Sequence, residues 1–435
     1  MKKLLSLLLV VLTVFSLAAC SAKKTDGDVT DNGSTDVSET EKIEIRNHNE
    51  TVAVGNGQTV IVLENGVLRV SSAENEQWYT GRYIKDPATG EVYWDSGVFN
   101  PAMQGYTAVA VDAASDYNLV LTVDRSLWYW GKAASIRDPR ISLSAEEYFE
   151  PVKILDDVAT FSAGEGHILA VKTDGSVWGL GENIYKEVTW ESDEKYIYEP
   201  VKIMDGCLAV AAGIDQSYVI KEDGTLLGWG HNDPKYCELG CADIDNSSDP
   251  VSEPVKIMDD VVFVEAGASC AYAITSDNTL WGWGSNEAGQ ICNGIQTIQT
   301  PVKIMEDVQT VSSNAFGGYC IAVKTDGTTW GWGSVKNGNS LGMDPGEYVS
   351  GVPFGDSTSY YNTDLKCVFG PIQLPMSNIC MVSAGNDHTV LVDNNGEMYF
   401  CGNTDNLANM YPEYADIKYC SDDIMGPVAG KILIP

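Results

Sequence analysis

The side chains best suited to chemistry in this chain are four histidines, and their spacing does not assemble a site. They are His48, His167, His231 and His388. The sequence contains no His-x-x-x-His or Cys-x-x-Cys pair, so it does not predict the zinc sites that such pairs build. It also lacks a glycine-rich phosphate loop and a Gly-x-Ser-x-Gly nucleophile elbow. The sequence therefore indicates neither a catalytic residue nor a cofactor.

Carboxylates are too abundant for any pair to stand out as an acid/base couple. The chain has 61 acidic and 27 basic residues and a formal net charge of −34. Such a charge repels nucleic acid and anionic lipid, so we expect no nucleic-acid partner. Asp243, Asp245 and Asp249 could ligate Ca²⁺, but they lack the glycine and the closing glutamate of an EF-hand loop. A solvated acidic loop is the alternative interpretation.

The first cysteine follows a short apolar segment. Lys2 and Lys3 precede an apolar stretch that ends at Leu17, too short to span a bilayer comfortably. The following Ala18-Ala19-Cys20 resembles the end of the bacterial lipobox. This resemblance implies cleavage before Cys20 and a diacylglyceryl group on its sulfur, which would anchor the protein to the outer side of a bacterial membrane. An ordinary signal peptide with an incidental cysteine is the alternative.

These features predict the domain organisation. We expect a lipoprotein signal peptide at 1–19 and, at 20–46, the lipidated cysteine followed by a polar, flexible tether. Five later cysteines fall on or beside expected strands as buried apolar residues: Cys207, Cys270, Cys320, Cys380 and Cys401. Cys237 and Cys241 form the nearest loop pair, either as a disulfide or as two thiols.

An internal repeat dominates the rest of the chain. The segment 254–267 closely resembles 151–164, and similar segments open at Pro200, Pro301 and Pro371. Each is followed by a tight-turn dipeptide such as Asp174-Gly175, and seven such turns are found, two of them in degenerate copies. A unit thus supplies four strands: Pro-Val-Lys-Ile, Val-x-x-Ala-Gly, the strand before the turn and the strand after it. A four-stranded repeat of roughly 50 residues is typical of a propeller blade.

The turn and the strand after it have clear sequence signals. Asp-Gly between alternating apolar residues predicts a hairpin with a type I′ turn, in which both central residues have positive φ. Arg125 and Asn278 replace the glycine, so we expect strain or another turn type in those two hairpins. The following strand has the pattern of Trp281-Gly-Trp283-Gly284, with both tryptophans on one side.

These motifs resemble a known family. The Ala-Gly-x-x-His pattern that ends at His167 and His388, the Asp-Gly hairpin and the Trp-x-Trp-Gly strand are similar to the regulator-of-chromosome-condensation repeat. The resemblance covers residues 51–435 and implies an all-β, seven-bladed propeller of four-stranded antiparallel blades, which we place at 47–435. The eukaryotic namesake is a nucleotide-exchange factor on chromatin, whereas bacterial relatives include a secreted propeller that inhibits β-lactamases by binding them. Other copies replace the histidine with Gln, Tyr or Cys, so we interpret it as a strand-end hydrogen-bonding residue.

The ends of the chain suggest how the ring closes. Residues 52–70 supply only three strands for the first blade, whereas 427–434 look like a surplus strand. We therefore expect the C-terminal strand to join the N-terminal blade and remove two exposed sheet edges.

Strand direction predicts two different faces. Consecutive antiparallel strands put the tight turns on one face and the long, variable, tyrosine-rich loops on the other. We expect the loop face to bind a protein or glycan of the envelope or exterior, although the rings could instead pack the loops onto the disc. A carbohydrate-active hydrolase or lyase with carboxylates on this face is one alternative function, and a purely structural role in the cell envelope is another. The expected contacts are Trp78, Tyr79, Trp190, Tyr196, Tyr198, Tyr360 and Tyr361, with Asp243 and Asp245 as a polar rim.

Overall fold

The computed structural model of the chain describes residues 51–55, 58–62, 66, 68–72, 83–85, 92–94, 100–102, 105–115, 117–131, 151–241, 250–291, 294–313, 318–335, 340–342, 360–362, 366–386, 388–402 and 428–433. The signal peptide and tether expected at 1–46, with Cys20, lie outside the described residues, as do Trp78, Tyr79, Asp243 and Asp245. Within the described part of the chain, no helix has the length and apolarity needed to cross a membrane.

Four-stranded antiparallel sheets repeat along the chain and confirm the all-β class. The first strands are β1 (Val52–Val54), β7 (Ala108–Ala113), β11 (Val158–Ala163), β15 (Cys207–Ala212), β19 (Val261–Ala266), β23 (Val308–Ser313) and β28 (Ile379–Ala384). The second strands are β2 (Gln58–Val62), β8 (Tyr117–Thr122), β12 (His167–Lys172), β16 (Gln216–Lys221), β20 (Cys270–Thr275), β24 (Tyr319–Lys324) and β29 (His388–Asp393). The third strands, five of which carry tryptophans, are β3 (Leu68–Ser72), β9 (Leu127–Gly131), β13 (Val177–Glu182), β17 (Leu226–Gly230), β21 (Leu280–Gly284), β25 (Thr329–Ser334) and β30 (Glu397–Gly402). The fourth strands are β6 (Asn100–Ala102), β10 (Val152–Leu155), β14 (Tyr196–Met204), β18 (Val251–Met258), β22 (Ile298–Met305), β27 (Cys367–Gln373) and β31 (Val428–Leu433).

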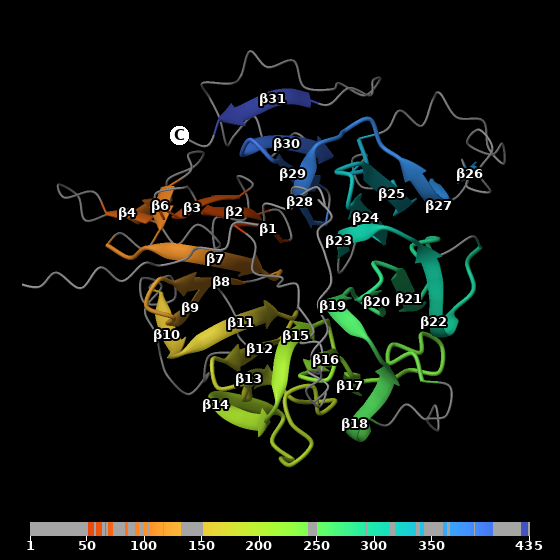
Figure 1. Cartoon of the computed structure of the whole chain (residues 1–435). Helices are drawn as coiled ribbons and strands as arrows, with labels where there is room; N and C mark the ends of the chain where they lie inside the picture. Colours follow the sequence, from red (N-terminus) through yellow and green to blue (C-terminus); the bar gives the residue numbers. More distant parts are fainter. Residues whose placement is uncertain are drawn as a thin grey trace, which may run out of the picture. The chain divides into compact units, whose positions relative to one another are not determined.

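The sheets surround a common centre, as in a propeller. First strands such as β1, β15, β19 and β28 lie near the centre, and fourth strands such as β14, β18, β22 and β31 lie at the periphery (Figure 1). Each sheet packs face to face on its neighbours, so the second strands are buried along almost their whole length, as in β8 and β29.

The expectation of seven four-stranded blades is wrong. The described strands form six four-stranded blades rather than seven, because the sheet that begins with β23 takes up β26 (Tyr360–Asn362) as a fifth strand outside β27. A separate two-stranded ribbon pairs β4 (Tyr83–Lys85) with β5 (Val92–Trp94). Both additions lie in long segments after a third strand, where the repeat is least regular.

The expected closure by the C-terminal strand is also wrong. β31 pairs with β30 in the last sheet, with Met398 opposite Ile432, and does not join the N-terminal blade. The reason is that a sheet does not begin with the Pro-Val-Lys-Ile strand but ends with it. Each Pro-Val-Lys-Ile strand pairs with the tryptophan strand before it, as Lys303 opposite Trp281 shows, and not with the strand that follows it in sequence. The C-terminal strand is therefore the ordinary fourth strand of its sheet.

Hydrogen bonds close the ring instead. The backbone N–H of Val54 in β1 donates to Ser383 Oγ in β28 at 3.0 Å. Thr59 Oγ1 lies 2.9 Å from His388 Nε2, and the N–H of Asn386 donates to the carbonyl of Gly55. The first and last sheets are thus joined by the same kind of contact that joins other neighbouring sheets.

The hairpin turns differ from the expected type I′. Gly175 has a φ of 80° and Gly224 a φ of 79°, whereas the aspartates before them do not have positive φ. Such loops are type I turns followed by one left-handed residue. The aspartate stabilises the turn, since Asp174 Oδ1 accepts from the N–H of Ser176 at 3.0 Å. Arg125 and Asn278 adopt the same left-handed conformation, with φ of 63° and 65°, so the turn type is kept and the strain falls on these residues.

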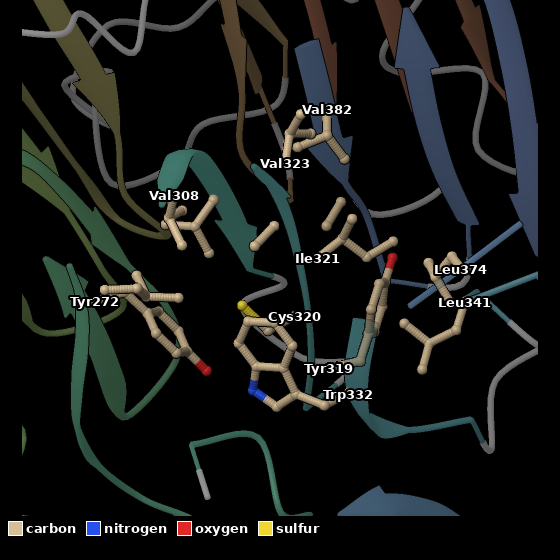
Figure 2. Packing of buried hydrophobic residues seen from close by; sticks show 14 of the residues in the cluster. Tyr272, Val308, Tyr319, Cys320, Ile321, Val323, Trp332, Leu341, Leu374 and Val382 are labelled. Carbon is tan, nitrogen blue, oxygen red and sulfur yellow. The ribbon is translucent and has the colours of Figure 1, made fainter. Parts of the chain in front are cut away.

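Large aromatic side chains fill the space between neighbouring sheets. The second tryptophan of the third strand is fully buried in four sheets, as Trp130, Trp229, Trp283 and Trp332. A tyrosine of the second strand accompanies it, as Tyr272 and Tyr319 do in the cluster around Trp332 (Figure 2). Burying each ring removes on the order of 150–250 Å² from water, which makes these layers a main source of stability.

Candidate functional site

Hairpins and short links lie together on one face, which we call the hairpin face. The N–H of Cys207, which begins β15, donates to the carbonyl of Gly175 in the preceding hairpin at 3.0 Å. Val261 bonds to Gly224 in the same way, and Val308 to Asn278. This confirms the expectation that tight turns make up one face.

Long loops and the turns between first and second strands lie on the opposite face, which we call the loop face. The chain leaves each third strand beside such a turn: the N–H of Glu182 donates to Gly166 O, that of His231 to Asp215 O and that of Ser285 to Ser269 O. The predicted division between the two faces is therefore confirmed for these sheets.

The loop at 183–195 is held in one shape by its own hydrogen bonds. Asn183, which is buried, accepts at Oδ1 from the N–H groups of Val188 and Thr189 at 3.1 and 2.9 Å. Its Nδ2 donates to the carbonyl of Glu194 at 3.0 Å. Lys186 closes the turn through an ion pair with Asp193 at 2.8 Å. The loop is thus preorganised, which lowers the entropic cost of binding through it.

A buried tryptophan ties this loop to the next sheet. Trp229 Nε1 donates to the carbonyl of Glu187 at 2.9 Å, and Ser217 Oγ donates to the same carbonyl at 2.7 Å. The arrangement recurs in the following sheets, where Trp283 donates to Glu238 O and Trp332 to Gln290 O. Reasoning from sequence missed this contact, although the regular spacing of the tryptophans was its signal.

Titratable groups gather between the loops of two neighbouring sheets. Glu187 is fully buried, and burial raises its pKa to about 7. Burial also raises the pKa of Asp215, whereas a hydrogen bond that His231 donates to the Glu238 carboxylate raises the pKa of His231. His231 Nδ1 lies 3.5 Å from Glu238 Oε1, and its ring centroid lies 4.3 Å from that of Tyr185. No group of three or more His, Cys, Asp or Glu among the described residues is placed to hold a metal ion.

One repeat of the chain matches a known family. The model of the regulator of chromosome condensation (RCC1) repeat matches residues 261–290, which comprise β19 to β21 and the start of the following loop. The chain is a β-propeller that contains the RCC1 repeat. The match confirms the resemblance predicted from the sequence, and a propeller of this kind presents loops for binding.

Solved structures share the fold over most of the chain. A chain in the crystal structure of Kap60 bound to yeast RCC1 (Prp20) has a TM-score of 0.66 and 17% identity, covering 93% of this chain and 90% of that one. Prp20p from Saccharomyces cerevisiae has a TM-score of 0.64 and 18% identity, covering 84% of this chain and 86% of its own. Human WBSCR16 has a TM-score of 0.50 and 20% identity, covering 61% of this chain and 68% of its own. No curated protein sequence matches this chain significantly. Identities this low show the RCC1-like fold and not a shared function.

The predicted contact residues occupy different environments in this RCC1-like propeller. Tyr196 is 37% exposed, and its ring stacks on that of Tyr198 with 5.9 Å between centroids and 11° between planes. Tyr196 lies opposite Glu182, the last residue of β13, and therefore at the loop-face end of β14. Tyr360 and Tyr361 lie in β26, opposite Phe369 and Val368.

Trp190 takes part in packing. Its ring is partly buried and lies edge-on to Trp229, with 6.1 Å between centroids and 77° between planes. The alternative interpretation of the loop-face aromatics, that they pack the loops onto the disc, therefore describes Trp190. Tyr196 and Tyr198 remain the described members of the predicted set with a ring placed at the surface.

The repeat histidines behave as strand-end hydrogen-bonding residues, as predicted. Both are buried, with His167 Nε2 at 2.8 Å from Ser217 Oγ and His388 bonded to Thr59 across the ring closure. Cys207, Cys270, Cys320 and Cys401 are buried, and Cys380 is half-buried. Cys237 and Cys241 are two free thiols, so the disulfide alternative is not present.

Proposed function

We propose that this chain is a binding module that takes a protein or glycan partner on its loop face. The observation that carries the proposal is the loop at 183–195, which hydrogen bonds fix to its own sheet and to the next one. It lies beside the stacked pair of the exposed Tyr196 and the half-buried Tyr198. Rigid loops on a scaffold are a usual place for recognition. Stacked tyrosines offer a large contact area at low entropic cost.

The solved relatives support a protein partner. Yeast RCC1 (Prp20) is bound to Kap60 in one structure, and the other describes the binding of Prp20p to Gsp1p and histones. The net charge of −34 argues against a nucleic-acid ligand and favours a partner with a basic surface.

We also propose that the module is lipid-anchored outside the cytoplasm, as the residues Leu17 to Cys20 indicate. Mass spectrometry of the N-terminal peptide from the membrane fraction tests this proposal. We expect the peptide to begin at a diacylated Cys20, and a Cys20→Ser variant to carry no lipid. A wild-type peptide without lipid, or with another first residue, would contradict the anchor.

The loop face is tested with partners captured from envelope and culture-medium components and with a glycan array. For any ligand found, Tyr196→Ala and Tyr198→Ala should each weaken binding by about 1–3 kcal/mol. The matched control is Tyr106→Ala, since Tyr106 is 47% exposed and lies in the link before β7, on the hairpin face. Normal binding by both loop-face variants, together with loss of binding in Tyr106→Ala, would place the site on the other face.

A further inference from the structure

The first strands of neighbouring sheets are joined by side chains that face the centre of the ring. A first strand has no neighbouring strand on the side of the centre. One of its backbone N–H groups donates instead to a side-chain oxygen from the preceding sheet, which avoids the cost of a buried, unsatisfied donor. The pairs are Asp112 Oδ2 with Ala163 N at 2.8 Å, Ser162 Oγ with Ala212 N at 3.1 Å, Glu265 Oε1 with Ser313 N at 3.1 Å, Ser312 Oγ with Ala384 N at 3.0 Å and Ser383 Oγ with Val54 N at 3.0 Å.

Three of these five acceptors are serines, so the contact does not require a charge. A neutral hydroxyl accepts the bond at Ser162, Ser312 and Ser383 at distances close to those of the carboxylates. Asp112 and Glu265 therefore place ionisable carboxyl groups at the centre, where a serine hydroxyl serves in the other sheets.

The two carboxylates line a central cavity. Its volume of about 120 Å³ is several times the ~15 Å³ that one water molecule needs. Residues of all the first strands line it, and the turn residues Gly55, Ala114 and Gly164 place it toward the loop face. Its charged lining residues are Asp112, Glu165 and Glu265, and no lysine, arginine or histidine is among them. The other walls are small or apolar, with Phe263 as the largest side chain.

Two further observations indicate that the cavity suits a polar, cationic ligand. Ser313 lines it, and its Oγ is buried with no hydrogen-bond partner. Burial and the nearby Asp112 raise the pKa of Glu265 to about 8, so this carboxyl holds a proton at neutral pH that an entering cation would displace.

We propose that the central cavity binds the ammonium group of a lysine side chain that a protein partner inserts from the loop face. An ammonium has three donors for the two carboxylates and the hydroxyl, and its methylene stem suits the apolar walls. The described residues offer no metal-binding cluster, which makes a metal ion a poorer fit. The inference rests on the proposed function, because it assumes that the partner docks on the loop face.

The probe is Nα-acetyl-lysine amide, which keeps its side-chain ammonium. Its control is Nα-acetyl-norleucine amide, which has a similar stem and no ammonium. Calorimetry with the full chain should detect binding of the lysine compound only. Asp112→Ser and Glu265→Ser keep the hydrogen-bond acceptor that other sheets use, and each should weaken that binding at least about tenfold. Glu253→Ser, at an exposed position of β18, makes the same change in charge and should leave the affinity unchanged.

The pH dependence adds a second readout. Because the cation favours the ionised form of Glu265, the affinity of the wild type for the lysine compound should rise from pH 6.5 to pH 9. The Glu265→Ser variant should not show this rise. Asp112 and Glu165 are the other titratable groups of the lining. Equal binding of the norleucine compound, tighter binding of N-acetyl-arginine amide, or unchanged affinity in both serine variants would overturn the proposal. Tyr196→Ala should bind the lysine compound normally, so a failed loop-face site and a failed cavity remain distinguishable.

Discussion

His167 Nε2 lies 2.8 Å from Ser217 Oγ of the neighbouring sheet, and the histidine is completely buried. Burial lowers the pKa of His167 to about 3, so the ring is neutral in the folded protein. Equivalent positions carry Gln58 and Gln216, whose side-chain amides donate to carbonyls of the next sheet. A neutral bridge between sheets is therefore what this position requires.

This burial predicts a pH-dependent loss of stability. Since the folded pKa lies below the usual 6.5, the unfolded chain binds more protons between pH 6.5 and pH 3, and stability falls as the pH is lowered through that window. We expect His167 to cost about 2 kcal/mol at pH 5 relative to pH 8. His167→Gln should remove that difference, as measured by urea unfolding at both pH values. Parallel profiles for the variant and the wild type would contradict the prediction.

Glu187 should show the opposite dependence. Its pKa of about 7 lies above the usual 4.5, so the stability that the protonated carboxyl provides is complete below pH 4.5 and is lost as the pH rises to 7. Gln290 occupies the corresponding place in a later loop and accepts from the N–H of Ala288. Glu187→Gln should therefore gain about 2–3 kcal/mol relative to wild type between pH 5 and pH 8. The exposed Glu191→Gln is the control, and an equal gain there would refute a specific role for Glu187.

The two tryptophans of one strand should differ sharply in their contribution. Trp283 is fully buried and donates to the carbonyl of Glu238 at 2.8 Å, whereas Trp281 is half-buried and bonds to Thr275 Oγ1 at 3.2 Å. Trp283→Phe should lower the free energy of unfolding by about 2–3 kcal/mol, because it loses packing and a buried hydrogen bond. Trp281→Phe should cost less than about 1 kcal/mol. Chemical denaturation measures both, and similar losses would show that the layer between sheets is not the main support.

Gly284, which ends the same strand, is required by its backbone. It has a φ of 98°, and a Cβ there would lie 2.5 Å from the carbonyl oxygen of Ser269. Gly284→Ala should cost at least about 3 kcal/mol through strain and displacement of that backbone. Gly206 is the control, because it has a φ of 72° in open space and Asp260 takes its place in another sheet with a φ of 60°. Gly206→Asp should be nearly neutral by thermal unfolding, and an equally mild Gly284→Ala would contradict the argument.

Local sequence signals determined most of the repeating unit. The Asp-Gly hairpins, the period-two tryptophan strands and the division into a hairpin face and a loop face all depend on contacts between residues close in the chain. The resemblance to the RCC1 repeat rested on the same short motifs, and the strand-end role of His167 followed from comparing its copies. These predictions held because hairpins and strand alternation are local properties.

Tertiary structure decided how the units join. A Pro-Val-Lys-Ile strand has a tryptophan strand before it and a first strand after it, and sequence alone does not show which one it pairs with. The ladder between β30 and β31 and the bond from Val54 to Ser383 settled both the phase and the closure. The packing of Trp190 against Trp229 likewise depended on the neighbouring sheet. Asp112 and Glu265 meet at one cavity only because the sheets form a ring, and no local pattern of residues encodes that meeting.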